Sequence, residues 1–135
     1  MVTEKNWLEE YPWSGYDEHE SWFESFVKDF PGWRDITIQF CESVNKLLEQ
    51  EPGAKKELTI LELKEKFGGI RIYFGPIECS HRFYNELLSL TRIFEMSSYA
   101  TCAHCGKDAD IVYIGGYAAV LCPTCHAEFL SKLDK

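Results

Sequence analysis

The 135-residue sequence contains no long apolar run, and none of its segments approaches the roughly 18 to 20 apolar residues of a membrane-spanning helix. Its first residues, 1–7, lack a basic segment followed by an apolar core, so they do not predict a secretory signal. These absences lead us to expect a cytoplasmic location and no membrane association. In that compartment cysteines stay reduced, and disulfides are rare.

The sequence also lacks a cluster of basic residues. It carries 14 Lys and Arg against 22 Asp and Glu, for a net charge of −8. Residues 1–30 hold eight acidic residues and two lysines, so this segment alone contributes −6. Nucleic-acid binding depends on clustered cations that neutralise phosphates, and nucleic acid is therefore a poor candidate partner. A protein with a basic surface is a better one, because complementary charges speed association.

No repeat, low-complexity segment or Gly/Ser/Pro-rich linker divides the chain, so residues 1–135 are predicted to form a single domain. Hydrophobic spacing predicts helices over residues 17–30, 33–50 and 80–98, with Ser14 or Asp17 capping the first and Ser80 the last. The β-prone runs 58–64 and 70–74, separated by a turn at 65–69, predict a hairpin. We therefore expect an α+β fold, with a helix-helix-hairpin-helix part over residues 1–98 and a metal-binding module over residues 99–135.

Four of the six cysteines form two Cys-x-x-Cys pairs, Cys102/Cys105 and Cys122/Cys125, with sixteen residues between them. That spacing is a strong zinc signature, because a two-residue gap lets a tight turn direct both sulfurs at one ion. Two β-prone runs, 110–114 and 117–121, flank a Gly-Gly step that predicts a hairpin turn, and Pro123 begins a predicted helix. Knuckle, hairpin and helix in this order predict a treble-clef or zinc-ribbon-like module that holds one structural Zn²⁺.

Other uses of these cysteines fit the pattern less well. A redox pair needs one Cys-x-x-Cys beside a βαβ unit, and disulfides need an oxidising compartment. A catalytic zinc normally keeps one position open for water, whereas four thiolates close the site. His104 and His126 are each adjacent to a predicted ligand, and either could replace a cysteine. Because four thiolates already suffice, we expect both imidazoles to be exposed or to lie just outside the ligands.

The acidic first third of the chain is dense in aromatic residues and holds all four tryptophans. One set recurs at helical spacing within residues 17–30, which predicts core packing. The aromatic residues before that helix lack periodicity, and Trp and Tyr are frequent hot spots of interfaces. We therefore predict a partner-binding surface made of these residues and two neighbouring acids: Trp7, Glu9, Glu10, Tyr11, Trp13 and Tyr16.

No catalytic constellation stands out in the sequence. His19, Glu78, Cys79 and His81 are candidates by residue type alone. Cys79 and His81 are close in sequence, but residues two apart do not face each other on a helix. An orienting carboxylate or an oxyanion donor is not identifiable either. No catalytic residue is therefore predicted, and Cys41 is expected to fill space in the core.

Three stretches are similar to a known family. They are Gly32-Trp33 ahead of a helix, the run Leu63-Lys64-Glu65-Lys66-Phe67-Gly68-Gly69-Ile70-Arg71-Ile72-Tyr73, and the cysteine pairs in the context Cys102-x-x-Cys105-Gly106 and Leu121-Cys122-x-x-Cys125. Over residues 31–128 the chain resembles a family of small zinc-ribbon-like proteins of bacteria and their phages. This resemblance implies a zinc site on the four cysteines and no established activity. The acidic, aromatic N-terminal segment departs from the family's pattern.

Three functions follow from these features, in decreasing order of support. The first is a non-enzymatic, zinc-stabilised protein-binding module, an inhibitor or immunity-type protein of a phage or bacterium that blocks a basic surface of its partner. The second is a nucleic-acid-associated zinc-ribbon regulator, supported by the zinc module and the small basic patch of Lys64, Lys66 and Arg71. The third is an enzyme of unassigned chemistry.

Overall fold

The structure is a computed structural model that describes residues 5–56 and 58–133. Its α-helices are α1 (Trp7–Glu10), α2 (Trp22–Asp29), α3 (Arg34–Gln50), α4 (His81–Ser98) and α5 (Pro123–Leu133), and three 3-10 segments lie at Pro12–Ser14, Pro31–Trp33 and Pro52–Lys56. Strand β1 (Ile60–Lys66) pairs antiparallel with β2 (Gly69–Phe74), and β3 (Asp110–Ile114) pairs antiparallel with β4 (Tyr117–Leu121). This combination of helices and two hairpins confirms the predicted α+β class.

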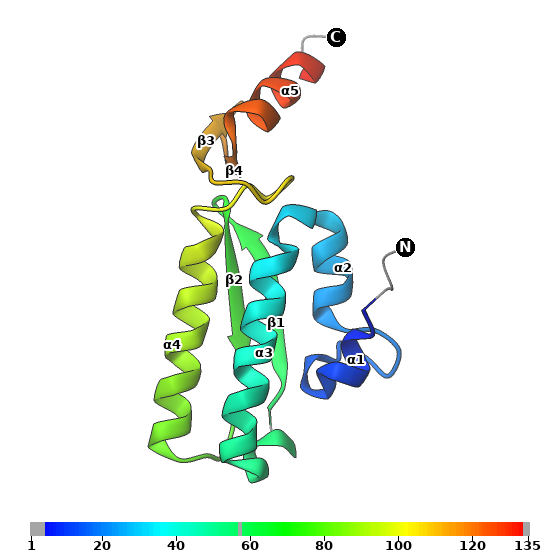
Figure 1. Cartoon of the computed structure of the whole chain (residues 1–135), viewed down its shortest axis with the longest axis vertical. Coiled ribbons are helices and arrows are strands. Elements are labelled where there is room, and N and C mark those ends of the chain that lie inside the picture. The colour runs from blue at the N-terminus through cyan, green and yellow to red at the C-terminus, as the bar shows by residue number, and fades with distance from the viewer. Residues whose placement is uncertain (1–4, 57, 134–135) are drawn as a thin grey trace.

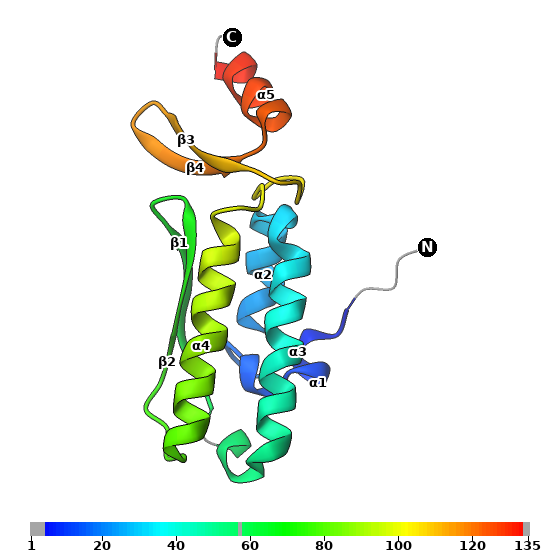
Figure 2. The same cartoon turned by 60° about the vertical axis from the view of Figure 1, so that its left-hand side comes forward.

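Helices α3 and α4 run side by side in opposite directions and form the long axis of the molecule (Figures 1 and 2). The β1–β2 hairpin lies along this pair, and α2 lies beside β1. The second hairpin and α5 lie beyond the end where α3 begins and α4 ends. Helix α5 projects away from the main body and contacts mainly β4. Its apolar residues Phe129, Leu130 and Leu133 are accordingly exposed.

Aromatic side chains from distant segments form the centre of the core. The ring of Phe40 on α3 stacks on that of Phe94 on α4, with centroids 4.4 Å apart. Phe74 on β2 and Trp13 from the first 3-10 segment complete this group, with centroids 6.4 Å from the Phe40 ring. Large rings bury much apolar surface per residue, so the N-terminal segment is an integral part of this core.

Helix α2 begins at Trp22, five residues later than the predicted start. Its N-cap is Ser21, whose hydroxyl accepts a hydrogen bond from the Phe23 N–H. The predicted caps, Ser14 and Asp17, have other partners. The Ser14 hydroxyl donates to the Tyr11 carbonyl, while one carboxylate oxygen of Asp17 accepts from the backbone N–H groups of residues 19 and 20. Such local side-chain bonds compete with helix formation, and residues 15–21 therefore form a closed loop.

Helix α4 attaches the first hairpin through buried polar contacts. Ser80 caps it as predicted, accepting a hydrogen bond from the Phe83 N–H. Near its C-terminus, the Ser98 hydroxyl accepts from the Ile70 N–H at 2.9 Å, and the Glu95 carboxylate accepts from the Ile72 N–H at 3.0 Å.

Within residues 5–56 and 58–133, no helix is both long and apolar enough to cross a membrane.

The tip of the first hairpin is shorter than the predicted turn at 65–69. Phe67 and Gly68 form the two-residue loop, with φ of 53° and 93°, and the Glu65 carboxylate accepts a hydrogen bond from the Gly68 N–H. Gly69 belongs to β2 and lies against the Tyr99 ring, where a Cβ would be 2.3 Å from Cζ. The first glycine therefore provides a positive φ, and the second provides space for a ring.

Candidate metal centre

The first cysteine pair lies on a tight backbone turn, which we call the knuckle (residues 101–106). The Cys102 N–H donates to the Lys107 carbonyl at 2.7 Å, and the Gly106 N–H donates to the Cys102 carbonyl at 2.9 Å. Gly106 has a φ of 85°, a conformation that favours glycine. The Cys105 N–H points at the Cys102 sulfur, 3.5 Å away. The turn therefore directs both sulfurs to the same side.

The β3–β4 hairpin returns the chain to the knuckle. Its turn residues Gly115 and Gly116 have φ values of 57° and 90°, as the Gly-Gly step predicts. The Ala103 N–H donates to the Val120 carbonyl at 2.9 Å, so β4 is attached directly to the knuckle. Cys122 follows β4, and Cys125 lies in the first turn of α5, where its N–H points at the Cys122 sulfur at 3.5 Å. This order of knuckle, hairpin and helix is that of a treble clef.

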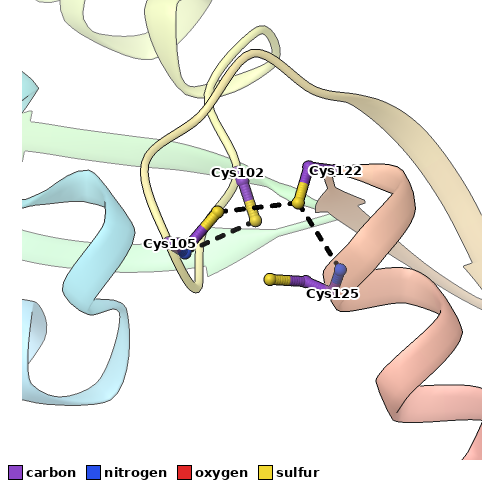
Figure 3. Close-up of side chains that lie close together, drawn as sticks. All are labelled: Cys102, Cys105, Cys122 and Cys125. Atoms are coloured by element: carbon purple, nitrogen blue, oxygen red, sulfur yellow. Dashed lines mark hydrogen bonds between the residues drawn. The ribbon is translucent and has the colours of Figure 1, made fainter.

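The four cysteine sulfurs face one another in a single cluster (Figure 3). All four Sγ atoms lie within 4.8 Å of one another, and those of Cys105 and Cys122 are 3.5 Å apart. Four sulfurs held tetrahedrally at a Zn–S distance of 2.3 Å would be about 3.8 Å apart. Cys102, Cys122 and Cys125 are buried, and Cys105 is exposed. The arrangement can hold one metal ion with four sulfur ligands.

The electrostatics of the cluster favour a bound cation. Burial raises the pKa of the Cys102 thiol, but hydrogen bonds from nearby backbone N–H groups outweigh it and bring the pKa to about 6. Burial, and then the neighbouring sulfurs, raise the pKa of the Cys125 thiol. Negative charges this close together cannot all form without a counter-charge. A divalent cation would provide that charge and allow the thiols to ionise together.

The knuckle is fastened to the main body by the 3-10 segment Pro31–Trp33. The Gly32 N–H donates to the Ala103 carbonyl at 2.9 Å, and the Trp33 indole N–H donates to the Thr101 carbonyl at 2.8 Å. Gly32 has no room for a side chain, because a Cβ would lie 2.0 Å from the Cys102 carbonyl oxygen. In the sequence, Gly32-Trp33 and the cysteines are linked only by the family resemblance, which predicts no contact between them. The structure shows that they are in direct contact.

The glycines of the first hairpin also approach the metal module. A Cβ on Gly68 would lie 3.4 Å from the backbone of Ala118 and Ala119 in β4. Tyr99, the residue after α4, packs against Gly69 and accepts a hydrogen bond from the Arg71 guanidinium at 2.7 Å. All three stretches that carry the resemblance therefore meet at one end of the molecule. Comparison with protein-family models, with curated proteins and with solved structures finds no match, so family membership stays a prediction.

The predicted aromatic anchors lie mostly in the core. Trp7, Tyr11 and Trp13 are 5%, 0% and 4% exposed, which differs from the exposed surface that we expected. The Tyr11 hydroxyl donates to Glu42 at 2.7 Å, and the Trp13 indole N–H donates to Asn45 at 2.8 Å. These hydrogen bonds give both buried side chains polar partners on α3. The lack of periodicity in this segment therefore did not indicate an exposed surface.

Of the predicted partner-binding residues, Tyr16, Glu9 and Glu10 are exposed. Glu9 and Glu10 line an open cavity between α1 and α3, and Glu10 pairs with Lys5 at 3.0 Å. Tyr16 lies in a different cavity, together with Trp22. Trp22 belongs to the helical set that periodicity assigned to the core, yet it is half-buried. The aromatic rings available to a partner, Tyr16 and Trp22, therefore lie at or just before the start of α2, whereas the predicted acids Glu9 and Glu10 are exposed on α1.

The candidate catalytic residues do not form a site. His19 is exposed in the loop before α2, and His81 is exposed at the start of α4. Burial raises the pKa of the Cys79 thiol, whereas a nucleophilic cysteine needs a lowered one. Among the described residues, no hydrogen bond joins Cys79 to His81. His104 and His126 lie outside the four-cysteine cluster.

Proposed function

We propose that this protein is a non-enzymatic, zinc-stabilised module that binds a basic surface of a partner protein and blocks it. The observation that carries the proposal is a set of unpaired carboxylates in the N-terminal third. Residues 5–30 contain seven acidic residues, and Glu10 alone among them forms an ion pair within residues 5–56 and 58–133. Unpaired surface charge of one sign attracts a partner of the opposite sign and raises the association rate.

The basic residues of the first hairpin are engaged within the chain, which supports a protein partner over nucleic acid. Lys64 pairs with Glu62, and the Lys66 ammonium lies 5.5 Å from the centre of the Phe67 ring. The Arg71 guanidinium donates to the Tyr99 hydroxyl and to the Ile70 carbonyl. Phosphate binding would have to break or share these contacts.

We infer that the metal is Zn²⁺ and that its role is structural. Four thiolates are a preferred ligand set for zinc, and together they leave no open position for a substrate or for water. Metal analysis of protein purified without added zinc should give about one equivalent, since four ligands serve one ion. The double variant Cys122→Ser/Cys125→Ser should lose the metal and the protection of residues 99–133 in amide hydrogen exchange. A metal-free protein with the same protection would contradict the inference.

The partner proposal requires a test that leaves the core intact. Deleting residues 1–20 is unsuitable, because Trp7, Tyr11 and Trp13 belong to the core. Instead, wild-type protein is immobilised and exposed to cell lysate, and the proteins that bind are eluted with increasing salt. At about 1 M salt the Debye length is about 3 Å, so attraction between surface charges is screened. We expect a basic protein that elutes with salt and then binds the purified chain at defined stoichiometry. Retention that is independent of salt, or absence of a stoichiometric complex, would refute the proposal.

A further inference from the structure

A cavity of about 200 Å³ opens between the loop before α2, helix α2 itself and strand β1. Its floor is apolar, because Phe26 and Leu63 are each only 7% exposed. Its walls carry two aromatic rings and two carboxylates, from Tyr16, Trp22, Glu20 and Asp29. We call these six residues with their cavity the Tyr16 pocket. A water molecule occupies about 30 Å³ in the liquid, so the pocket has room for the end of a long side chain.

The Tyr16 pocket is held in shape by the loop that carries two of its residues. The Tyr16 N–H donates to the Glu20 carbonyl at 2.7 Å, which places these residues side by side. Below them, the buried hydroxyls of Ser14 and Ser21 are hydrogen-bonded at 2.7 Å. The Tyr16 ring, although 62% exposed, meets the Trp22 ring edge to face with centroids 4.8 Å apart. A ligand would therefore meet rings that are already in place, which reduces the entropy lost on binding.

The charges of the pocket specify a cation. Neither Glu20 nor Asp29 forms an ion pair within residues 5–56 and 58–133. The faces of Tyr and Trp rings attract cations, and carboxylates near the rings add to this attraction. A metal ion is a poor match, because the group of potential metal ligands found among the described residues is the four-cysteine cluster. An organic cation satisfies both the rings and the carboxylates.

We propose that the Tyr16 pocket takes an arginine side chain of the basic partner, an assignment that rests on the proposed function. The planar guanidinium stacks on aromatic faces and donates hydrogen bonds in a fork that fits carboxylates, whereas the ammonium of lysine is a compact and strongly hydrated charge. The guanidinium lies against Tyr16 and Trp22 and donates to Glu20 and Asp29. The methylene groups of the arginine lie over the apolar floor.

The direct test is a titration with three short capped peptides that differ at one residue: arginine, lysine and citrulline, the uncharged analogue of arginine. Binding is followed by NMR at the tryptophan indole N–H signals, with Trp22→Phe identifying the Trp22 signal. Trp22 is half-buried, whereas Trp7, Trp13 and Trp33 are no more than 5% exposed. We expect the arginine peptide to shift the Trp22 signal most and the citrulline peptide to leave it in place.

Variants separate the pocket from general attraction to an acidic protein. Glu20→Gln/Asp29→Asn should weaken binding of the arginine peptide about tenfold, as expected from two exposed charge contacts. The matched control Glu49→Gln/Asp110→Asn removes the same charge from exposed positions on α3 and β3, outside the acidic N-terminal third, and should leave binding nearly unchanged. Tyr16→Ala leaves the charge unaltered and should weaken binding about threefold through loss of a cation–π contact. Thermal unfolding of each variant verifies that the fold is retained.

Several results would overturn the assignment. Equal weakening by the two double variants would show that only overall charge matters. If the citrulline peptide bound equally well, a positive charge would not be required for binding. If the lysine peptide bound equally well, the pocket would not select the guanidinium group. A partner protein that binds regardless of the Tyr16 and Glu20/Asp29 variants would exclude the pocket and leave the proposed function standing. Absence of any partner would defeat the proposed function, while the peptide titration would still decide what the pocket binds.

Discussion

Replacing Gly32 with alanine tests how the metal module is held on the main body. A Cβ at this position would lie 2.0 Å from the Cys102 carbonyl oxygen, 2.6 Å from the Gly106 nitrogen and 2.7 Å from the Ala103 carbonyl carbon. All three are backbone atoms of the knuckle, so no side chain can rotate away to make room. The knuckle must therefore move by about 1 Å, since overpacked sites relax through backbone shifts.

That movement lengthens and weakens the two hydrogen bonds that attach the knuckle to the 3-10 segment Pro31–Trp33. They join Gly32 to Ala103 at 2.9 Å and Trp33 to Thr101 at 2.8 Å, and the Trp33 side chain is fully buried. Each weakened bond costs about 1 kcal/mol, and more where a buried donor is left without an acceptor. Alanine recovers about 0.5 to 1 kcal/mol of backbone entropy relative to glycine. We expect a net loss of about 1 to 3 kcal/mol in the free energy of unfolding, the upper value applying if the Trp33 N–H loses its acceptor, or roughly 4 to 10 °C in Tm.

The chain contains a matched control at Gly53. Like Gly32, Gly53 follows a proline at the start of a 3-10 segment, but a Cβ there would have no atom within 4 Å. Gly53→Ala should therefore be neutral or stabilise by up to about 1 kcal/mol. Urea unfolding of the metal-loaded proteins, followed by tryptophan fluorescence, measures both effects. Gly32→Ala with wild-type stability would refute the proposed fastening of the knuckle.

Two further predictions concern buried polar groups. Burial, and then the hydrogen bond to Glu42, raise the pKa of the Tyr11 hydroxyl. The folded state therefore keeps the hydroxyl proton, whereas the unfolded chain loses it above the ordinary tyrosine pKa of about 10. The contribution of Tyr11 to stability is thus fully present below about pH 10. Above this pH the free energy of unfolding falls by up to about 1.4 kcal/mol per pH unit. Tyr11→Phe should show a shallower loss between about pH 9 and pH 11 in urea midpoints, and parallel curves for the two proteins would contradict this origin. Ser98→Ala removes the acceptor of the buried Ile70 N–H and should destabilise by about 1 to 3 kcal/mol, whereas Ser89→Ala on the exposed face of α4 should change stability by less than about 0.5 kcal/mol. Equal effects of the two serine substitutions in thermal unfolding would show that the Ser98 hydroxyl contributes nothing.

Local patterns in the sequence predicted the elements whose stability is decided locally. The spacing of the cysteines and the Gly115-Gly116 step predicted the knuckle, the β3–β4 hairpin and the return of the second cysteine pair to the first. Ser80 predicted the start of α4, because an N-cap acts on backbone groups two or three residues away. The α+β class followed from the same kind of evidence.

The sequence failed where contacts between distant residues decide the outcome. Trp13 lies in a three-residue 3-10 segment, and Tyr11 lies between that segment and the four-residue α1, so neither shows periodicity. Both side chains are nevertheless buried and hydrogen-bonded to α3. Asp17 resembled a helix cap, but its carboxylate closes a loop instead. The Tyr16 pocket could not be predicted, since Leu63 joins it from strand β1, 47 residues after Tyr16. Periodicity describes one element at a time and cannot report which elements will meet.

The contact between Trp33 and Thr101 spans 68 residues of sequence. At synthesis rates of 5 to 20 residues per second, Trp33 is added to the chain roughly 3 to 14 s before Thr101, which provides its partner carbonyl. During that interval the indole N–H must be hydrated or bound by another group, because an unpartnered buried donor is costly. The fluorescence of Trp33 should therefore change when the cysteine module docks, so this tryptophan can report on the docking step during folding.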